Sequence, residues 1–334
     1  MRGRRETSKY SNGSVSSFFR KGEFMSDREK KKHSFLRTIG TVAAAGTAAY
    51  GGLSWHLFNK LFDLERNSLH SVSLRQDGDE EAVNRWLVQA KRTDAYLQSF
   101  DGLTLHAIVI TNHPEGHRWV LLAHGFGQSA MDMAGYMLEA DKRGYNILAI
   151  DQRGCGGSRG RYCGMGWLEH YDVISWCSWL CEHDSDCAIA LIGVDIGANA
   201  VMNAAGDYLS PHVKCGVEDG GCSDLKEELL YLLKSEPDLP SGAFIVGIDF
   251  FVKHLLHFSI YEYSTRRQLL TARIPLLFIH GNQDAVVPAS MAIACSDACS
   301  SRKELALYDQ CGHNEAVRQP DYFDKVFGFI ETAF

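Results

Sequence analysis

The sequence lacks the short motifs that bind nucleotides, redox cofactors or metals. Its glycine-rich stretches match neither G-x-G-x-x-G nor G-x-x-x-x-G-K, the patterns that place backbone amides around phosphates. None of its ten cysteines forms a C-x-x-C pair, and the i,i+4 pairs Cys177/Cys181 and Cys295/Cys299 have no histidine at a metal-binding spacing. We therefore expect no cofactor and no metal, and we interpret the cysteines as small buried apolar residues.

Basic residues are scarce beyond the amino-terminal end of the chain. Residues 1–38 contain 11 lysines and arginines against 4 acidic residues, whereas the remainder contains 23 against 37. An acidic body does not favour nucleic acid as a partner. A content of 45% hydrophobic and 22% charged residues is typical of a globular protein, and most of the 334 residues fit one large domain.

Residues 1–34 are polar and basic and show no periodicity, so we expect them to be disordered. The segment Lys21–Phe24 can be encoded by a purine-rich ribosome-binding site directly before Met25. Our hypothesis is that translation starts at Met25 and that residues 1–24 are not part of the native protein.

No charged residue occurs between Thr38 and Asn59. As a helix, these 22 residues would extend about 33 Å, enough for the hydrocarbon core of a bilayer. The basic residues before them predict a cytoplasmic amino terminus and an extracytoplasmic domain. We therefore predict a transmembrane or signal-anchor helix over residues 35–59 and a place in the cell membrane. The alternatives are a cleaved signal peptide and a helix packed on a cytoplasmic domain.

From residue 95 onward, short apolar segments alternate with helical patterns. Tyr96–Phe100 and Leu103–Thr111 flank Asp101-Gly102, a hairpin signal. Six further strands are expected at Trp119–Ala123, Asn146–Ile150, Ala188–Gly193, Val213–Val217, Pro275–Ile279 and Glu304–Tyr308. This order predicts an α/β domain over residues 60–334, with a mostly parallel, doubly wound sheet of eight strands. Residues 223–273, rich in Leu, Phe and Tyr, are expected to form a lid between strands six and seven.

Polar residues follow several of these strands at their carboxyl ends, where open α/β sheets form their sites. Asp195 follows the fifth strand between Gly193 and Gly197, Asp284 the seventh and His313 the eighth. A glycine-flanked polar residue between a strand and a helix has the layout of a nucleophile elbow. The chain order therefore predicts Asp195 in the place of the nucleophile, Asp284 as the acid and His313 as the base. Asp219, after the sixth strand, is the alternative acid.

These motifs resemble the bacterial alpha/beta-hydrolases of the esterase, acyl-hydrolase and serine-aminopeptidase-like branch, many of them membrane-anchored at the amino terminus. The resemblance begins near residue 60 and is carried by Ser99–Leu103, His124-Gly125, Asp151–Ser158, Gly164–Trp167, Val217–Asp219, His280–Pro288 and Gly312-His313. It implies an oxyanion hole made of the backbone amides of Phe126 and Ile196. The sequence departs from the family at Asp195, which occupies the position of the nucleophilic serine.

An aspartate at this position excludes serine-esterase chemistry. Attack by a carboxylate on an ester would have to expel an alkoxide, which is far more basic than the carboxylate. A carboxylate does attack saturated carbon, giving an alkyl-enzyme ester that histidine-activated water hydrolyses. Haloalkane dehalogenases and epoxide hydrolases of this fold work in that way. The supporting groups differ here: Ile196 replaces the halide-binding tryptophan that commonly follows the nucleophile of dehalogenases, and residues 124–127 read HGFG where epoxide hydrolases have HGxP.

We therefore predict a hydrolase that acts on a small or apolar molecule with an Asp-Asp-His constellation. The lid tyrosines Tyr231, Tyr261 and Tyr263 are candidate acids, although core or rim packing is the more usual role for such residues. One alternative has Asp195 act as a general base for water. Another is an inactive pseudo-hydrolase, a membrane-anchored binding module in which two carboxylates keep His313 protonated.

Overall fold

The computed structural model describes residues 46–67, 80–233 and 241–334. Residues 1–49 and 50–334 form two compact units, and the described part of the first unit, residues 46–49, is helical. The predictions for residues 1–34, and for positions 35–45 of the expected membrane helix, lie outside the described residues.

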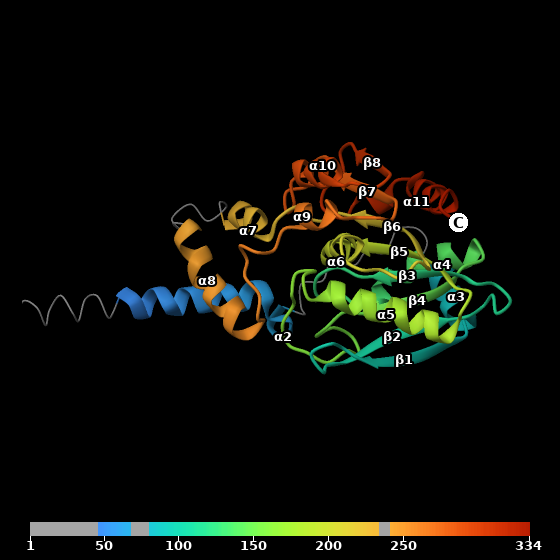
Figure 1. Cartoon of the computed structure of the whole chain (residues 1–334), viewed down its shortest axis with the longest axis horizontal. Coiled ribbons are helices and arrows are strands. Elements are labelled where there is room, and N and C mark those ends of the chain that lie inside the picture. The colour runs from blue at the N-terminus through green and yellow to red at the C-terminus, as the bar shows by residue number, and fades with distance from the viewer. Residues whose placement is uncertain (1–45, 68–79, 234–240) are drawn as a thin grey trace, which may run out of the picture. The chain divides into compact units, whose positions relative to one another are not determined.

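Eight strands form one sheet in the order β1-β2-β4-β3-β5-β6-β7-β8 (Figure 1). Their bounds are β1 Arg92–Gln98, β2 Thr104–Ile110, β3 Arg118–Ala123, β4 Asn146–Asp151, β5 Ala188–Val194, β6 Val213–Asp219, β7 Leu276–Gly281 and β8 Lys303–Tyr308. Strand β2 is antiparallel to both of its neighbours, and all other neighbouring strands are parallel. The prediction of a mostly parallel sheet of eight strands is confirmed.

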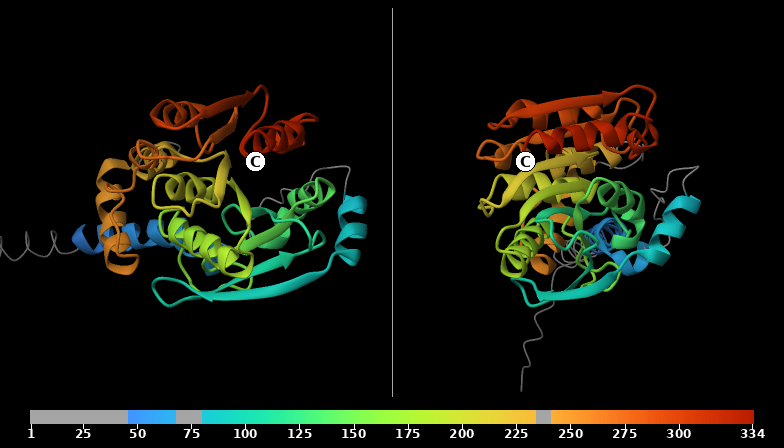
Figure 2. Two further views of the ribbon diagram at one scale, coloured as in Figure 1. Left: turned by 45° about the vertical axis from the view of Figure 1, so that its right-hand side comes forward. Right: turned by 90° about the vertical axis from the view of Figure 1, so that its right-hand side faces the viewer.

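Helices cover both faces of this sheet (Figure 2). One face carries α3 (Glu80–Gln89), α4 (Ala134–Lys142) and α11 (Tyr322–Glu331), and the other carries α5 (Glu169–His183), α6 (Ile196–Ala205) and α10 (Ala289–Ala298). Side chains of a strand alternate between these faces. In β3, Val120 and Leu122 pack on the first side, and Trp119 and Leu121 pack on the second. Two apolar layers therefore fix the sheet between the helices.

The described residues between β6 and β7 include the helices α7 (Leu225–Leu233), α8 (Ser241–Leu255) and α9 (Thr265–Leu269). Buried residues of α7 and α8 form one apolar cluster with residues 57–64 and with Ile196 at the start of α6. The lid prediction falls on these helices, and the cluster brings them to the edge of the sheet where Asp195 lies.

The prediction of a membrane-spanning helix is wrong. Among residues 46–67, 80–233 and 241–334, no helix has the length and apolar character needed to cross a bilayer. Residues 50–62 are helical, and their apolar side chains pack on α8. The rings of Trp55 and Phe251 lie 5.0 Å apart, and the Tyr50 hydroxyl donates a hydrogen bond of 2.6 Å to the carbonyl of Ala243. The membrane as a partner and the predicted membrane location, which rested on this helix, are withdrawn.

Gly247 of α8 packs directly against Ser54 of this helix. A Cβ atom at Gly247 would lie 2.1 Å from Ser54 Oγ and 2.7 Å from Ser54 Cβ. We expect Gly247→Ala to destabilise the protein by about 1–3 kcal/mol, because the helices must move apart. Gly328→Ala is the control, since a Cβ at this exposed helical position meets nothing within 4 Å. It should stabilise by about 0.5–1 kcal/mol. Urea unfolding measures the change in the free energy of unfolding for both variants. Equal changes in the two variants would contradict the close contact between Gly247 and Ser54.

Candidate active site

Asp195 lies in the tight turn between β5 and α6. Its backbone has φ 56° and ψ −118°, a left-handed conformation that is unusual for a residue other than glycine. A Cβ on Gly193 would lie 2.1 Å from the carbonyl oxygen of Gly197, and one on Gly197 would lie 2.1 Å from that of Ala123. Both flanking glycines are therefore required by the turn. Such strain is typical of functional sites.

The two carboxylate oxygens of Asp195 have different partners. Oδ2 accepts a hydrogen bond of 2.8 Å from the amide of Phe126, and Oδ1 lies 3.6 Å from Nε2 of His313. The structure thus brings the predicted oxyanion-hole residue Phe126 to the carboxylate itself. Ile196 begins α6, and within the described ranges its amide makes no hydrogen bond to this carboxylate.

Asp284 orients His313. Its Oδ2 accepts a hydrogen bond of 2.8 Å from Nδ1 of His313, and its Oδ1 accepts bonds of 2.8 Å from the amides of Val286 and Val287. Burial alone would raise the pKa of Asp284, but hydrogen bonds from His280 and His313 and the positive charge of His313 lower it well below its usual value. Asp284 is therefore a carboxylate, and it fixes the ring so that Nε2 faces Asp195.

His313 lies between two carboxylates, and this position determines its charge. Burial by itself would lower the pKa of His313, but hydrogen bonding to Asp195 and Asp284 and their negative charges raise it to about 10. At neutral pH the resting site thus contains an imidazolium between Asp195 and Asp284. Since an imidazolium cannot accept a proton, this histidine becomes a base only after one neighbouring charge is removed.

The alternative acid, Asp219, is placed differently. Its side chain is buried, and its Oδ2 accepts a hydrogen bond of 2.8 Å from the hydroxyl of Tyr322. Burial raises the pKa of Asp219 to about 6. Its backbone carbonyl accepts a hydrogen bond of 2.8 Å from the amide of Asp195. Asp219 therefore supports the turn under Asp195, while Asp284 contacts His313.

A cavity of about 330 Å³ opens in front of Asp195 and His313. This volume lies at the lower end of the range for small-molecule sites. Its polar lining residues are Lys60, Gln128, Asp195, Glu228, His313 and Asn314, and its apolar ones are Leu61, Phe126, Met165, Ile196, Leu232 and Val286. The helix of residues 50–62 and helix α7 therefore both contribute to a cavity that fits a small molecule of mixed character.

The three lid tyrosines do not line this cavity. Tyr263 is buried, and its hydroxyl donates a hydrogen bond of 2.6 Å to the carbonyl of Met165. Tyr231 and Tyr261 are exposed at the surface. The packing interpretation thus fits these residues better than an acid role does.

Glu228 is a buried, titratable cavity residue that was not predicted from the sequence. It lies on α7 and is 5% exposed, and its Oε2 has no hydrogen-bond partner among the described residues. Burial raises the pKa of Glu228 to about 7, and the nearby charge of Asp195 also raises it. A signal was present in the sequence: Leu225, Glu228 and Leu229 share a helical face, which places a carboxyl group in an apolar stripe.

Comparisons with known proteins agree with this architecture. Residues 118–248 match the family model described as alpha/beta hydrolase fold. The uncharacterized protein YqkD of Bacillus subtilis (strain 168) is 26% identical over 256 residues, which cover 76% of this chain and 82% of YqkD. The sheet and the family match place the chain among proteins with the alpha/beta hydrolase fold.

Two solved structures show the same fold. The Pyrococcus furiosus esterase Pf2001 has a TM-score of 0.62 and 21% identity, over 74% of this chain and 95% of that chain. The esterase RhEst1 from Rhodococcus sp. ECU1013 has a TM-score of 0.52 and 18% identity, over 72% of this chain and 99% of that chain. At these identities the likeness concerns the fold, and the chemistry has to be argued from the site.

Proposed function

We propose that this protein is a hydrolase that uses Asp195 to attack a saturated carbon atom of a small, partly apolar molecule. The observation that carries the proposal is the hydrogen bond from the Phe126 amide to Asp195 Oδ2. This amide would serve the substrate oxygen in a serine esterase. Here it contacts the enzyme's own carboxylate, so Oδ2 is already placed as the carbonyl oxygen of an alkyl-enzyme ester, and Oδ1 is the nucleophile.

An epoxide is the substrate class that best fits the cavity. Oδ1 of Asp195 attacks a ring carbon, the carbon–oxygen bond of the ring breaks, and the resulting alkoxide takes a proton. Glu228, buried in the cavity wall with an unpaired oxygen, is the donor of that proton. A haloalkane would instead need a halide site, and Ile196 occupies the position after the nucleophile.

Ester formation also activates the base. It removes the negative charge of Asp195, which is one of the two charges that raise the pKa of His313. The imidazolium then loses its proton to solvent and becomes a base. Neutral His313 takes a proton from a water molecule that adds to Cγ of Asp195, while the Phe126 amide stabilises the oxyanion on Oδ2.

Collapse of this intermediate returns the enzyme to its starting state. The acyl carbon–oxygen bond breaks, and the alcohol leaves with the proton from His313. The new carboxyl group of Asp195 passes its proton to His313, and Glu228 is reprotonated from solvent. The sum is one epoxide and one water giving one diol.

The second candidate function is that of a binding protein with a hydrolase fold. It is favoured by the charge of His313, because a pKa of about 10 leaves no base in the resting site. The two functions differ in what happens when an electrophile enters the cavity. In a binding protein, Asp195 keeps its charge, and His313 stays paired with both Asp195 and Asp284.

A substrate panel separates these candidates. We expect the wild type to hydrolyse epoxides and to leave acyl esters intact, and we expect Asp195→Asn, which keeps the shape of the side chain, to lose epoxide turnover. The measurement is product formation from epoxides, haloalkanes and acyl esters by both proteins and by Asp195→Ser. Esterase activity in Asp195→Ser, together with an inactive wild type, would support the binding protein and contradict our proposal.

A further inference from the structure

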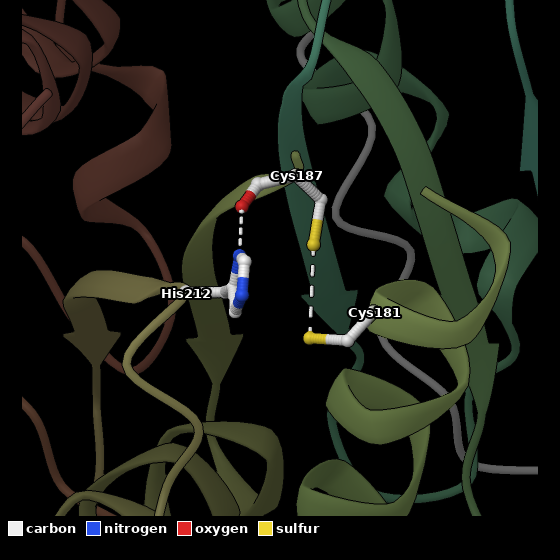
Figure 3. A group of neighbouring side chains, drawn as sticks. All are labelled: Cys181, Cys187 and His212. Carbon is white, nitrogen blue, oxygen red and sulfur yellow. Dashed lines mark hydrogen bonds between the residues drawn. The ribbon is translucent and has the colours of Figure 1, made fainter. Parts of the chain in front are cut away.

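Two cysteines and a histidine meet at the edge of the sheet opposite Asp195 (Figure 3). Cys181 lies near the end of α5, Cys187 directly precedes β5, and His212 directly precedes β6. Because β5 and β6 are parallel, the segments that enter them lie side by side. The proposed chemistry at Asp195 uses none of these residues.

The spacing of the two sulfur atoms matches that of thiolates on a shared metal ion. Sγ of Cys181 and Sγ of Cys187 are 3.7 Å apart, and the ligand atoms of all three residues lie within 4.8 Å of one another. A zinc–sulfur distance of about 2.3 Å and tetrahedral geometry place two thiolates about 3.8 Å apart. Little movement of the two cysteines is therefore needed to bind zinc.

His212 is oriented in the manner of a metal ligand. Its Nδ1 donates a hydrogen bond of 2.7 Å to the backbone carbonyl of Cys187. Because a carbonyl oxygen only accepts, Nδ1 carries the proton, and Nε2 has a free lone pair. Metal-binding histidines generally donate their other ring nitrogen to a carbonyl or carboxylate in this way, which fixes the tautomer.

The surroundings allow an ion to enter and to complete its coordination. Cys187 is buried, whereas Cys181 and His212 are partly exposed. The hydroxyl of Ser210 lies 3.5 Å from Sγ of Cys181, beside the group. Two thiolates and an imidazole favour zinc over magnesium or calcium, and water can take the fourth tetrahedral position.

We propose that Cys181, Cys187 and His212 bind one zinc ion at the amino-terminal edge of the sheet. The ion would link the end of α5 to the beginnings of β5 and β6. This assignment departs from the expectation of no metal. That expectation considered spacing along the chain, whereas the fold brings together a histidine and a cysteine that are 25 positions apart.

Cobalt substitution of the full-length, reduced protein tests this proposal. One equivalent of Co²⁺ is expected to give the thiolate-to-metal charge-transfer band and the visible bands of a tetrahedral site, and Zn²⁺ should displace it. Cys181→Ser and His212→Ala are each expected to weaken binding at least about 100-fold. Cys299→Ser, a change in the other i,i+4 cysteine pair, is the matched control and should bind like the wild type.

The result that would overturn the proposal is Co²⁺ binding without a charge-transfer band, or no binding by the wild type. Equal affinity of the wild type and Cys181→Ser would overturn it as well. Circular dichroism of the metal-free variants shows whether each one is folded. If Cys181→Ser does not fold, His212→Ala provides the same comparison at a partly exposed position.

Discussion

The His313→Gln variant should accumulate an alkyl ester on Asp195 when it is mixed with an epoxide. Glutamine cannot accept a proton from water, so the first half of the reaction proceeds and hydrolysis of the ester slows by about 10²–10⁴-fold. Intact-protein mass spectrometry should show one added substrate mass, and peptide mapping should locate it within residues 193–197.

Two control variants define the position and the cause of this adduct. Adding Asp195→Asn to His313→Gln should abolish it, because the nucleophile is then absent. His183→Gln changes an exposed histidine whose ring hydrogen-bonds to the carbonyl of Trp179, and it should turn over like the wild type without an adduct. An adduct on another residue would contradict covalent catalysis by Asp195. The absence of any adduct in His313→Gln, when the wild type prepared in the same way is active, would contradict it as well.

Ring opening should lose most of its rate when Glu228 is replaced by glutamine. The proposed donor must be protonated, and with a pKa of about 7 its acid form predominates below that pH and is lost above it. We therefore expect the wild-type rate of ester formation to fall as the pH rises through about 7. Glu228→Gln should be slower by about 10²–10⁴-fold and should lack this pH dependence.

The rate of ester formation is best measured in the His313→Gln background, where the adduct accumulates. Because the charge of His313 lowers the pKa of Glu228, the rate in this background should fall at a pH above 7. Glu227→Gln is the matched control on the same helix, since Glu227 pairs with Arg266 and is absent from the cavity wall. An unchanged epoxide rate in Glu228→Gln would rule out its role as the acid.

Much of the fold could be predicted because the strands are short apolar runs between clear turn signals. The expected strand Trp119–Ala123, for example, is observed as Arg118–Ala123. Carboxyl ends of parallel strands share one edge of the sheet, so the same reasoning placed Asp195, Asp284 and His313 at one edge. The contacts between His313 and both carboxylates agree with that prediction.

Other features depend on packing that spacing along the chain does not reveal. An uncharged segment rich in Ala, Gly and aromatic residues is equally suited to lipid and to an apolar cluster. Contacts of Trp55 with Phe251 show that the cluster forms. Glu228 reaches the cavity from a helix after β6, and His212 reaches Cys181 only through the crossover between two strands.

The most direct test of the central claim is a single turnover in ¹⁸O-water with enzyme in excess over epoxide. If water attacks Cγ of an Asp195 ester, the label enters the carboxylate of Asp195, and the first diol carries the unlabelled oxygen of Oδ1. Mass spectrometry of the peptide that contains Asp195 and of the diol measures both. Label in the diol and none in Asp195 would show that water attacks the substrate directly, with Asp195 as a general base, and would contradict the account.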